Sequence, residues 1–395
     1  MFYKFAIEVS PSVMTSDLMA TFHISATDLG NLAASYFYAY LLLQIPAGLL
    51  VDRFGPRKIT TAAIFLCGLG TWIFSSAETL TFATIGRFLS GAGAAFAAIS
   101  CLKLIGNWFP KNQFSLMAGL MMTVGMLGAV SGQAPLANFI EMMNWRSALE
   151  WIALFGIGFA ALFFLIVRDG NREKVSIPKD FSVVRGLSEI LRNPQGWLLS
   201  IYSGLAFAPV SIFGGLWGVP FMIQNYGISQ ISAANLVSLI FIGFAIGAPL
   251  AGFASDRLGH RKPVMIWGIV SALLSITAVL YLPLSIVWLS TLLFLFGASI
   301  SCFLLCFTMI REINTPILAA TSVGFMNAFD ALFGALSDPL TGKFLDMGWR
   351  GEFINGARLF PIEVYKLALF TLPAFLLISL VLLIFIKETH PVEAT

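Results

Sequence analysis

Five charged residues lie inside long apolar runs of the sequence: Lys4, Glu8, Arg87, Asp330 and Asp338. A charge in the hydrocarbon core of a bilayer costs at least ~2.5–3.5 kcal/mol on insertion scales, so each one needs a partner, a water-filled cavity or a function. Lys4 and Glu8 are spaced i, i+4, which places them on one helix face where they can pair. Lys4 therefore either pairs with Glu8 or reaches toward the nearer membrane surface, unless it has a function in a water-filled cavity.

A second polar face follows from 3-4-4 spacing, which puts Asn327, Asp330, Gly334 and Asp338 on one side of a predicted helix. Asp330 lies about 20 Å into that helix, near mid-bilayer, whereas Asp338 is nearer the outer end and is expected to be solvated. An acid at the depth of Asp330 can accept a proton, bind a substrate amine or form a structural hydrogen bond between helices. Asn327, Asp330 and Glu8 are therefore candidate substrate contacts, and Asp330 and Glu8 are also candidate proton carriers.

Aromatic and helix-breaking residues gather between 202 and 220, which predicts a discontinuous cavity wall. Tyr202 and Trp217 in this stretch, with Tyr38 from an earlier apolar run, are candidate substrate contacts. Plain packing is the alternative for each of them, because aromatic residues make up 14% of the chain.

A charged signature occurs twice, at an offset of 204 residues. Its glycines predict a close approach of neighbouring helices, and its aspartates are expected near a helix N-terminus, where the partial positive charge favours them. A repeat of this length predicts two homologous halves. The first copy comprises Gly48, Asp52, Arg53, Gly55, Arg57 and Lys58, and the second comprises Gly252, Asp256, Arg257, Gly259, Arg261 and Lys262.

Apolar helices must position these residues, because 58% of the 395 residues are hydrophobic and only 11% are charged. Soluble domains carry about 25% charged residues, so a water-soluble enzyme is excluded. Recurrent apolar runs are long enough to cross a hydrocarbon core of about 30 Å. The sequence predicts an all-α polytopic membrane protein with twelve transmembrane helices in two pseudo-symmetric six-helix halves. The helices are expected near 1–21, 29–51, 59–77, 80–105, 114–140, 147–167, 195–223, 232–254, 264–282, 286–310, 317–344 and 363–386.

The longest polar stretch, 168–194, divides the chain into an N-terminal half, 1–167, and a C-terminal half, 195–395. This loop is rich in Lys and Arg and is expected to contain a short surface helix. Most basic residues outside the predicted helices lie on the same side as this loop, so the loop and the C-terminus are predicted to be cytoplasmic. The first run is short and contains Ser10, Pro11 and Asp17, which indicates either a short helix or, as we favour, a start codon upstream of Met1.

Further motifs carry a family resemblance. These are the doubled signature, Arg87-Phe-Leu-Ser-Gly91-Ala-Gly93-Ala-Ala, Asn144-Trp145-Arg146, and Arg311-Glu312-Ile-Asn-Thr-Pro316. Together they resemble the major facilitator superfamily over essentially the whole chain. The resemblance implies a substrate site between the halves, signature loops that hold a cytoplasmic gate shut in the outward-open state, and helices 1 and 4 as cavity neighbours. Related anion carriers have a basic residue shortly before the proline of helix 1, so the resemblance also implies that Lys4, seven residues before Pro11, binds a substrate carboxylate or phosphate. Glu8 and Arg87 are then expected to form a pair that couples protonation to transport.

The segment around His23 to Gly48 resembles bacterial nutrient-uptake members, including phagosomal amino-acid and nucleoside transporters, and anion:cation symporters. The resemblance implies a proton-coupled symporter in the bacterial inner membrane. It would import a small polar or zwitterionic nutrient, with amino acids ahead of organic anions and nucleosides. The alternative is a proton-coupled exporter of a drug or siderophore, although the helix around Gly125–Pro135 departs from the drug-antiporter motif.

Other function classes lack their motifs. The sequence has no nucleotide-binding G-x-x-x-x-G-K-[ST], no H-E-x-x-H and no G-x-S-x-G, so neither a primary pump nor an enzyme is expected. The four Cys fall in apolar runs and are predicted to be small core residues. No cofactor, metal or nucleic-acid partner is expected, and the protein is predicted to be monomeric. Its partners would be a small-molecule substrate, protons and the lipid bilayer.

Overall fold

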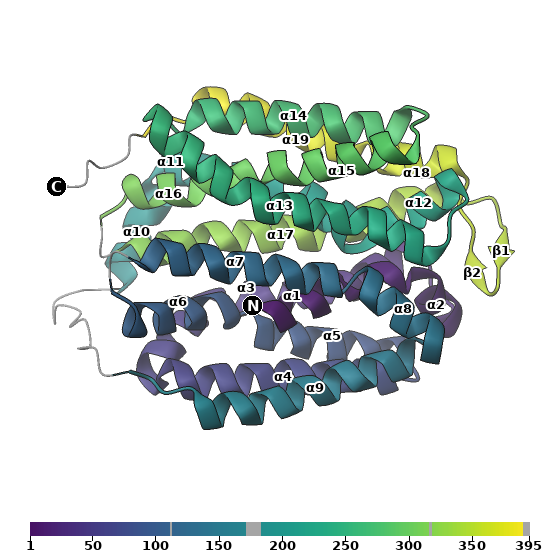
Figure 1. The fold of residues 1–395 in the computed structure, drawn as a ribbon, viewed down its shortest axis with the longest axis horizontal. Coiled ribbons are helices and arrows are strands. Elements are labelled where there is room, and N and C mark those ends of the chain that lie inside the picture. Colours follow the sequence, from purple (N-terminus) through teal and green to yellow (C-terminus); the bar gives the residue numbers. More distant parts are fainter. Residues whose placement is uncertain (111–112, 171–182, 316–317, 390–395) are drawn as a thin grey trace.

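The structure is a computed structural model that describes residues 1–110, 113–170, 183–315 and 318–389. Long helices run side by side along the longest axis of the molecule (Figure 1). The connections that carry the two signatures lie at one end of this axis, which we call the signature end. The β1–β2 hairpin (Phe353–Ile354 and Ala357–Arg358) lies at the opposite end, which we call the hairpin end.

The twelve predicted helical runs are present in two sets of six. The elements of the first half are α1 (Phe2–Val9), η1 (Ser10–Val13), α2 (Thr15–Phe22), α3 (Ala26–Phe54), α4 (Pro56–Ser76), α5 (Leu80–Ala94), α6 (Ala97–Trp108), α7 (Phe114–Ser131), α8 (Ala134–Met143) and α9 (Trp145–Ile166). After the short α10 (Val183–Arg192), the second half contains α11 (Pro194–Pro209), η3 (Val210–Trp217), α12 (Gly218–Tyr226), α13 (Gln230–Leu258), α14 (Lys262–Tyr281), α15 (Ile286–Ile300), η4 (Ser301–Leu304), α16 (Leu305–Glu312), α17 (Ala319–Met347), α18 (Ile362–Ala368) and α19 (Thr371–Phe385). The helix α10 confirms the surface helix predicted in the loop between the halves.

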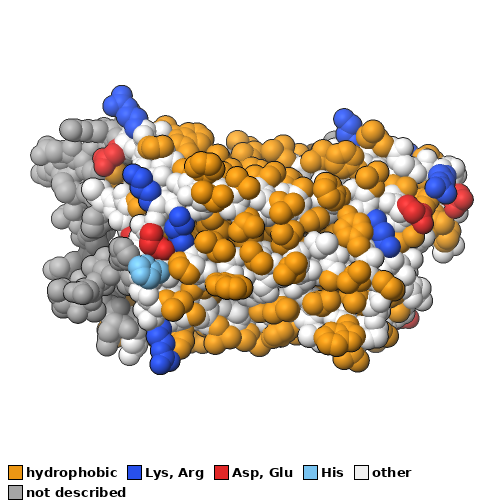
Figure 2. All heavy atoms as spheres, turned by 90° about the horizontal axis from the view of Figure 1, so that it is seen from above, with side chains coloured by type: hydrophobic (Ala, Val, Ile, Leu, Met, Phe, Trp, Pro, Cys, Tyr) orange, Lys and Arg blue, Asp and Glu red, His pale blue; other side chains and the backbone are white. Residues whose placement is uncertain are grey.

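The surface shows how the protein lies in a bilayer. Nine helices of the described chain are long and apolar enough to cross a membrane by length and composition. Helices α3 and α17 are 29 residues long and run beside them with more polar residues, and the first run is divided into α1, η1 and α2. Figure 2 shows an apolar band between two ends where the Lys, Arg, Asp and Glu side chains gather. The chain is therefore a multi-pass membrane protein.

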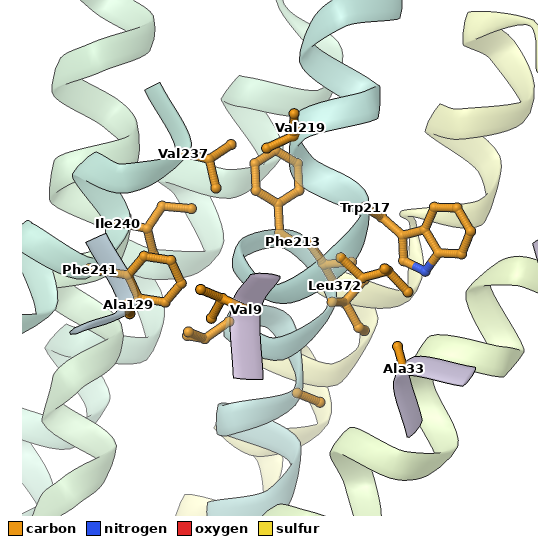
Figure 3. Close-up of a cluster of buried hydrophobic side chains, with 14 of the residues drawn as sticks. Val9, Ala33, Ala129, Phe213, Trp217, Val219, Val237, Ile240, Phe241 and Leu372 are labelled. Atoms are coloured by element: carbon orange, nitrogen blue, oxygen red, sulfur yellow. The ribbon is translucent and has the colours of Figure 1, made fainter. Parts of the chain in front are cut away.

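The two halves meet closely at the hairpin end. A Cβ added at Gly30 of α3 would lie 2.5 Å from the main-chain oxygen of Asp338 in α17, and Gly342 of α17 packs on the backbone of Ala26. Val9 and Ala129 of the first half share one buried cluster with Phe213, Ile240 and Phe241 of the second (Figure 3). The core between the halves therefore lies toward this end.

At the signature end the contact between halves is looser. A Cβ added at Gly48, Gly119, Gly252 or Gly324 would meet no atom of the described chain within 4 Å. The predicted close approach of helices at Gly48 and Gly252 is therefore wrong for this conformation. Hydrogen bonds between the halves, such as Gln133 to Gly214 and Asn327 to Tyr40, lie at the hairpin end or at mid-depth.

Candidate functional site

A buried ion pair in α1 begins the site. The Lys4 ammonium lies 2.5 Å from the Glu8 carboxylate, and both side chains are about nine-tenths buried. The i, i+4 spacing had allowed this pairing, which is now confirmed. The same ammonium lies over the Phe5 ring at 3.7 Å and 5.3 Å from the centre of the Tyr40 ring, so aromatic faces surround the positive charge.

Arg87 repairs a break in the first helix. Pro11 has no N–H, so the Ile7 carbonyl lacks its helical partner four residues on. The Arg87 guanidinium donates to that oxygen at 2.8 Å and to the Glu8 main-chain oxygen at 3.4 Å, and the Ser10 hydroxyl donates to Ile7 at 2.9 Å. The predicted side-chain pair between Glu8 and Arg87 is therefore wrong for this conformation. Glu8 pairs with Lys4, and the Arg87 guanidinium donates to main-chain oxygens.

A polar connection crosses from one half to the other at mid-depth. The Asn327 amide of α17 donates to the Tyr40 hydroxyl of α3 at 3.1 Å. One turn farther along α17, Asp330 is 7% exposed and accepts a 2.5 Å hydrogen bond from the Ser203 hydroxyl of α11. The Lys4–Glu8 pair, Tyr40, Asn327 and Asp330 thus form one site built by both halves.

Three predicted substrate contacts lie elsewhere. Tyr38 is 37% exposed and makes none of the contacts of this cluster, in which Tyr40 supplies the hydroxyl of α3. Trp217 is fully buried, and its indole N–H points to the Asp338 main-chain oxygen at 3.4 Å. Tyr202 is also fully buried, and its hydroxyl has no hydrogen-bond partner among the described residues. Tyr202 and Trp217 therefore act as packing residues in this conformation.

The predicted break between 202 and 220 corresponds to a change of helix type. A π-helix, η3, replaces α-helix from Val210 to Trp217, directly after Pro209. The fully buried Gln133, which follows α7 in the other half, donates to the Gly214 main-chain oxygen in η3 at 2.6 Å. An irregular helix is stable at this depth because a side chain from the opposite half satisfies its backbone.

The first signature copy binds a carboxylate that the sequence analysis missed. Asp169, after α9, accepts from the Arg57 backbone N–H at 2.7 Å at the start of α4. The Arg57 guanidinium donates to the Phe164 main-chain oxygen and lies over the Phe164 ring at 4.2 Å. Arg53 and Lys58 are exposed, and the side chain of Asp52 lies outside the described residues. The acid at this helix N-terminus is Asp169, where the interaction with the helix dipole is favourable.

The second copy repeats this arrangement. Glu388, after α19, accepts from the backbone N–H groups of Arg261 and Lys262 at 2.8 and 3.1 Å, at the start of α14. The Arg261 guanidinium contacts Asp256 at 2.5 Å and Glu312 at 3.1 Å. Burial of this guanidinium opposes its charge, but the two carboxylates outweigh burial and raise its pKa above the usual value. The expectation that Asp256 caps a helix is wrong, since it pairs with Arg261. Gly259 ends α13 with a positive φ, and Arg257 is exposed.

A second polar cluster joins the halves at the hairpin end. Asp346 of α17 accepts from the backbone N–H groups of Ala26 and Thr27 at 3.0 and 2.8 Å and from the Thr27 hydroxyl at 2.6 Å. Arg358 of β2 pairs with Asp346 at 2.9 Å. We call these contacts, with those of Gln133 to Gly214 and of Gln230 to the Val13 main-chain oxygen, the hairpin-end gate.

Sequence reasoning missed several of these residues. Asp169 and Glu388 each follow the last helix of a half, so the internal repeat was the signal that could have found them. Asp346, Gln133 and Ser203 carry no such signal, because their roles depend on which helices meet in three dimensions.

Twelve helical runs of the described chain, in two related halves with a shared polar cluster between them, are an architecture known from secondary transporters. Residues 1–218 and 199–394 each match the Major Facilitator Superfamily, and the chain belongs to this family. The similar proteins include transporters and a membrane sensor protein, UhpC of Salmonella typhimurium, and the family is not one of enzymes.

Similar proteins have related descriptions. The chain is 24% identical to the lysosomal dipeptide transporter MFSD1 of Danio rerio, over 96% of this chain and 84% of that protein. It is 23% identical to the uncharacterized transporter YybO of Bacillus subtilis over 62% of this chain, and it spans 61% of the length of that relative. A crystal structure of a bacterial homolog of the human lysosomal transporter Spinster, in an inward-facing and unoccupied conformation, superposes with a TM-score of 0.81. That structure is 18% identical, and the match covers 98% of this chain and 94% of the other.

Proposed function

We propose that this protein is a proton-coupled secondary active transporter that imports a small zwitterionic nutrient by alternating access, with amino acids and short peptides first and organic anions or nucleosides next. One observation carries the proposal. The first half supplies the Lys4–Glu8 pair and the second half supplies Asp330, and the hydrogen bond between Tyr40 and Asn327 joins them across the halves. The dipeptide transporter among the similar proteins supports this substrate class.

The charges suit a molecule with separate ionic groups. A substrate carboxylate can bind the Lys4 ammonium, and a substrate amine can bind Asp330, with the aromatic faces of Phe5 and Tyr40 against the apolar part. A buried charge that loses its partner is costly, so substrate groups that replace the internal partners keep the site neutral. Protonation of Glu8 or Asp330 changes this balance by one charge and couples proton movement to substrate movement.

We infer the orientation from the basic residues. Lys and Arg gather in the signature loops and in the loop between the halves, so the signature end and the C-terminus face the cytoplasm of a bacterial inner membrane, and the hairpin end faces outward. The contacts between halves at the hairpin end then describe an inward-facing state. The halves 1–167 and 195–395 would move against each other as a monomer, and the signature loops would close the inner side in the opposite state.

The test is uptake into proteoliposomes with an imposed proton gradient. Asp330→Asn is expected to lower the accumulation of substrate above the external concentration at least about tenfold, because the amide cannot carry a proton. If Asp330 carries only the proton, exchange of substrate down its own gradient remains; if it also binds the amine, exchange is lost as well. Glu352→Gln, an exposed acid in the hairpin connection, is the matched control. Accumulation by Asp330→Asn at the wild-type level would contradict the role of this acid.

The substrate class is tested by thermal stability of the purified protein. A ligand at about 100 times its Kd stabilises the folded state by about 2.7 kcal/mol. Amino acids and dipeptides are expected to raise the unfolding temperature, and Lys4→Met is expected to remove that rise. If only nucleosides or dicarboxylates raise the unfolding temperature, the proposed zwitterionic substrate class is wrong. The proposal of a transporter would then stand with another substrate.

A further inference from the structure

Asp338 is a buried acid that the proposed substrate site does not use. Its side chain is 2% exposed, although the sequence predicted that it is solvated. Its Oδ1 atom has no hydrogen-bond partner among the described residues. Asp338 shares the α17 face of Asp330 but lies eight residues, or about 12 Å, closer to the hairpin end.

Asp338 lies at the seam that must part when the hairpin end opens. The α3 backbone at Gly30 packs directly on the Asp338 carbonyl group and on Pro339. The Trp217 indole of η3 lies against the same carbonyl oxygen. The Asp338 side chain lies within electrostatic range of Arg87 and Glu8 of the first half, so separation of the halves here would bring water to it.

The groups facing Asp338 do not neutralise it by direct contact. Arg87 of α5 and Glu8 of α1 act on its carboxyl group electrostatically with opposite signs, and Tyr38 is the titratable residue of α3 within range. Arg87 is already bonded to the carbonyls of Ile7 and Glu8. No described residue forms an ion pair with Asp338. An ionised carboxylate is therefore unfavourable here while the seam is closed.

We propose that Asp338 is a second proton-binding acid of this transporter, and that the hairpin-end gate closes on its neutral form. In the open gate a hydronium ion from the outer side gives its proton to the Asp338 carboxylate and leaves water. The neutral acid is then buried without an uncompensated charge. Loss of this proton to water on the signature side leaves a buried carboxylate, which favours reopening of the gate. The inference rests on the proposed proton-coupled transport and names a second acid for it.

The experiment measures opening of the gate without substrate. Val13 is 1% exposed at the hairpin end, so a Val13→Cys variant reacts with a membrane-impermeant maleimide from the outer side when the gate opens. The chain with its four native cysteines gives the background. Ser285→Cys, at an exposed position, corrects for the pH dependence of the reagent. As the outer pH falls from about 8 to about 5, the corrected labelling of Val13→Cys is expected to fall several-fold.

Asp338→Asn added to Val13→Cys is expected to keep labelling low at every pH, at least about fivefold below the parent at the alkaline end. Glu352→Gln, at an exposed acid of the same end, is the control and should retain the pH dependence. If Asp338→Asn does not fold, Asp338→Glu tests the same point, because it keeps a titratable group and should shift the midpoint. A pH profile unchanged by either Asp338 variant would overturn the proposal. Because the labelling experiment uses no substrate, its result can be interpreted even if the proposed substrate class is wrong.

Discussion

At the scale of single residues, Arg87 shows how one side chain compensates for a proline. The Ile7 carbonyl, which Pro11 leaves without its helical donor, receives the Arg87 guanidinium and the Ser10 hydroxyl. Arg87 is 1% exposed and lies over the Tyr36 ring at 5.0 Å, so water cannot replace it. Its role is to hold the broken first helix in place beside the Lys4–Glu8 pair.

This gives a prediction for Arg87→Lys. A single ammonium on a shorter side chain cannot reach both carbonyls, and hydrogen bonds to charged groups contribute about 1.5–3 kcal/mol. The variant is expected to lose about that much stability in thermal or denaturant unfolding. The pH profile of the remaining uptake should be unchanged. A flattened pH profile with normal stability would show that Arg87 takes part in proton coupling.

Residue patterns predicted part of the site. Spacing alone gave the Lys4–Glu8 pair, because i, i+4 neighbours on a helix meet whatever surrounds them. It also placed Asn327 and Asp330 on one face. Tyr40 and Ser203 were missed, because their hydroxyl groups gain a role only from the helix that lies opposite.

At the scale of elements, the carboxylates that follow α9 and α19 support the signature helices within each half. Asp169 accepts from the first turn of α4, and Glu388 accepts from the first turn of α14. Neither contact crosses between the halves, so neither should depend on which end of the transporter is open.

Asp169→Ala and Glu388→Ala are therefore expected to lower stability without changing the conformational equilibrium. Loss of a side-chain acceptor at a helix N-terminus costs about 1 kcal/mol. Thermal unfolding should show this loss, while labelling of Val13→Cys from the outer side stays at the parent level. A change in labelling with unaltered stability would make these acids part of the gate.

Hydropathy predicted the twelve membrane-spanning runs because crossing a bilayer sets the length of each apolar run. The β1–β2 hairpin was not predicted. The breaks were harder to place. Pro209 and the glycines that follow it indicated an interruption. The backbone of the π-helix η3, however, is bonded by Gln133 from the other half, and no local pattern reveals that contact. The opposite error occurred at Gly48 and Gly252, where the sequence predicted close contact that this conformation lacks.

At the scale of the whole molecule, the difference between the two ends is the main finding. Each half keeps its own polar contacts at the signature end, whereas Asp346 and Gln133 bind across the halves near the hairpin end. A contact made in only one state shifts the equilibrium toward that state by its own free energy. One sequence must encode both states, so the family motifs could not show which is described here.

The last prediction concerns Asp346, whose carboxylate receives two backbone N–H groups and the Thr27 hydroxyl at the start of α3. A carboxylate at a helix N-terminus contributes about 0.5–2 kcal/mol. Because Asp346 lies in the second half and α3 in the first, Asp346→Ala removes this energy only from the state in which the hairpin end is closed. A loss of about 1 kcal/mol changes the ratio of the two states about fivefold.

Labelling of Val13→Cys from the outer side is expected to rise. Labelling of Gly324→Cys from the opposite side, at the signature end, is expected to fall by a matching factor. Glu352→Gln removes a nearby exposed charge and should change neither. If the two halves move as one alternating unit, as proposed, both ends must respond in opposite directions. A rise at Val13 without a fall at Gly324 would indicate local loosening of the hairpin end and would contradict the gate role of Asp346.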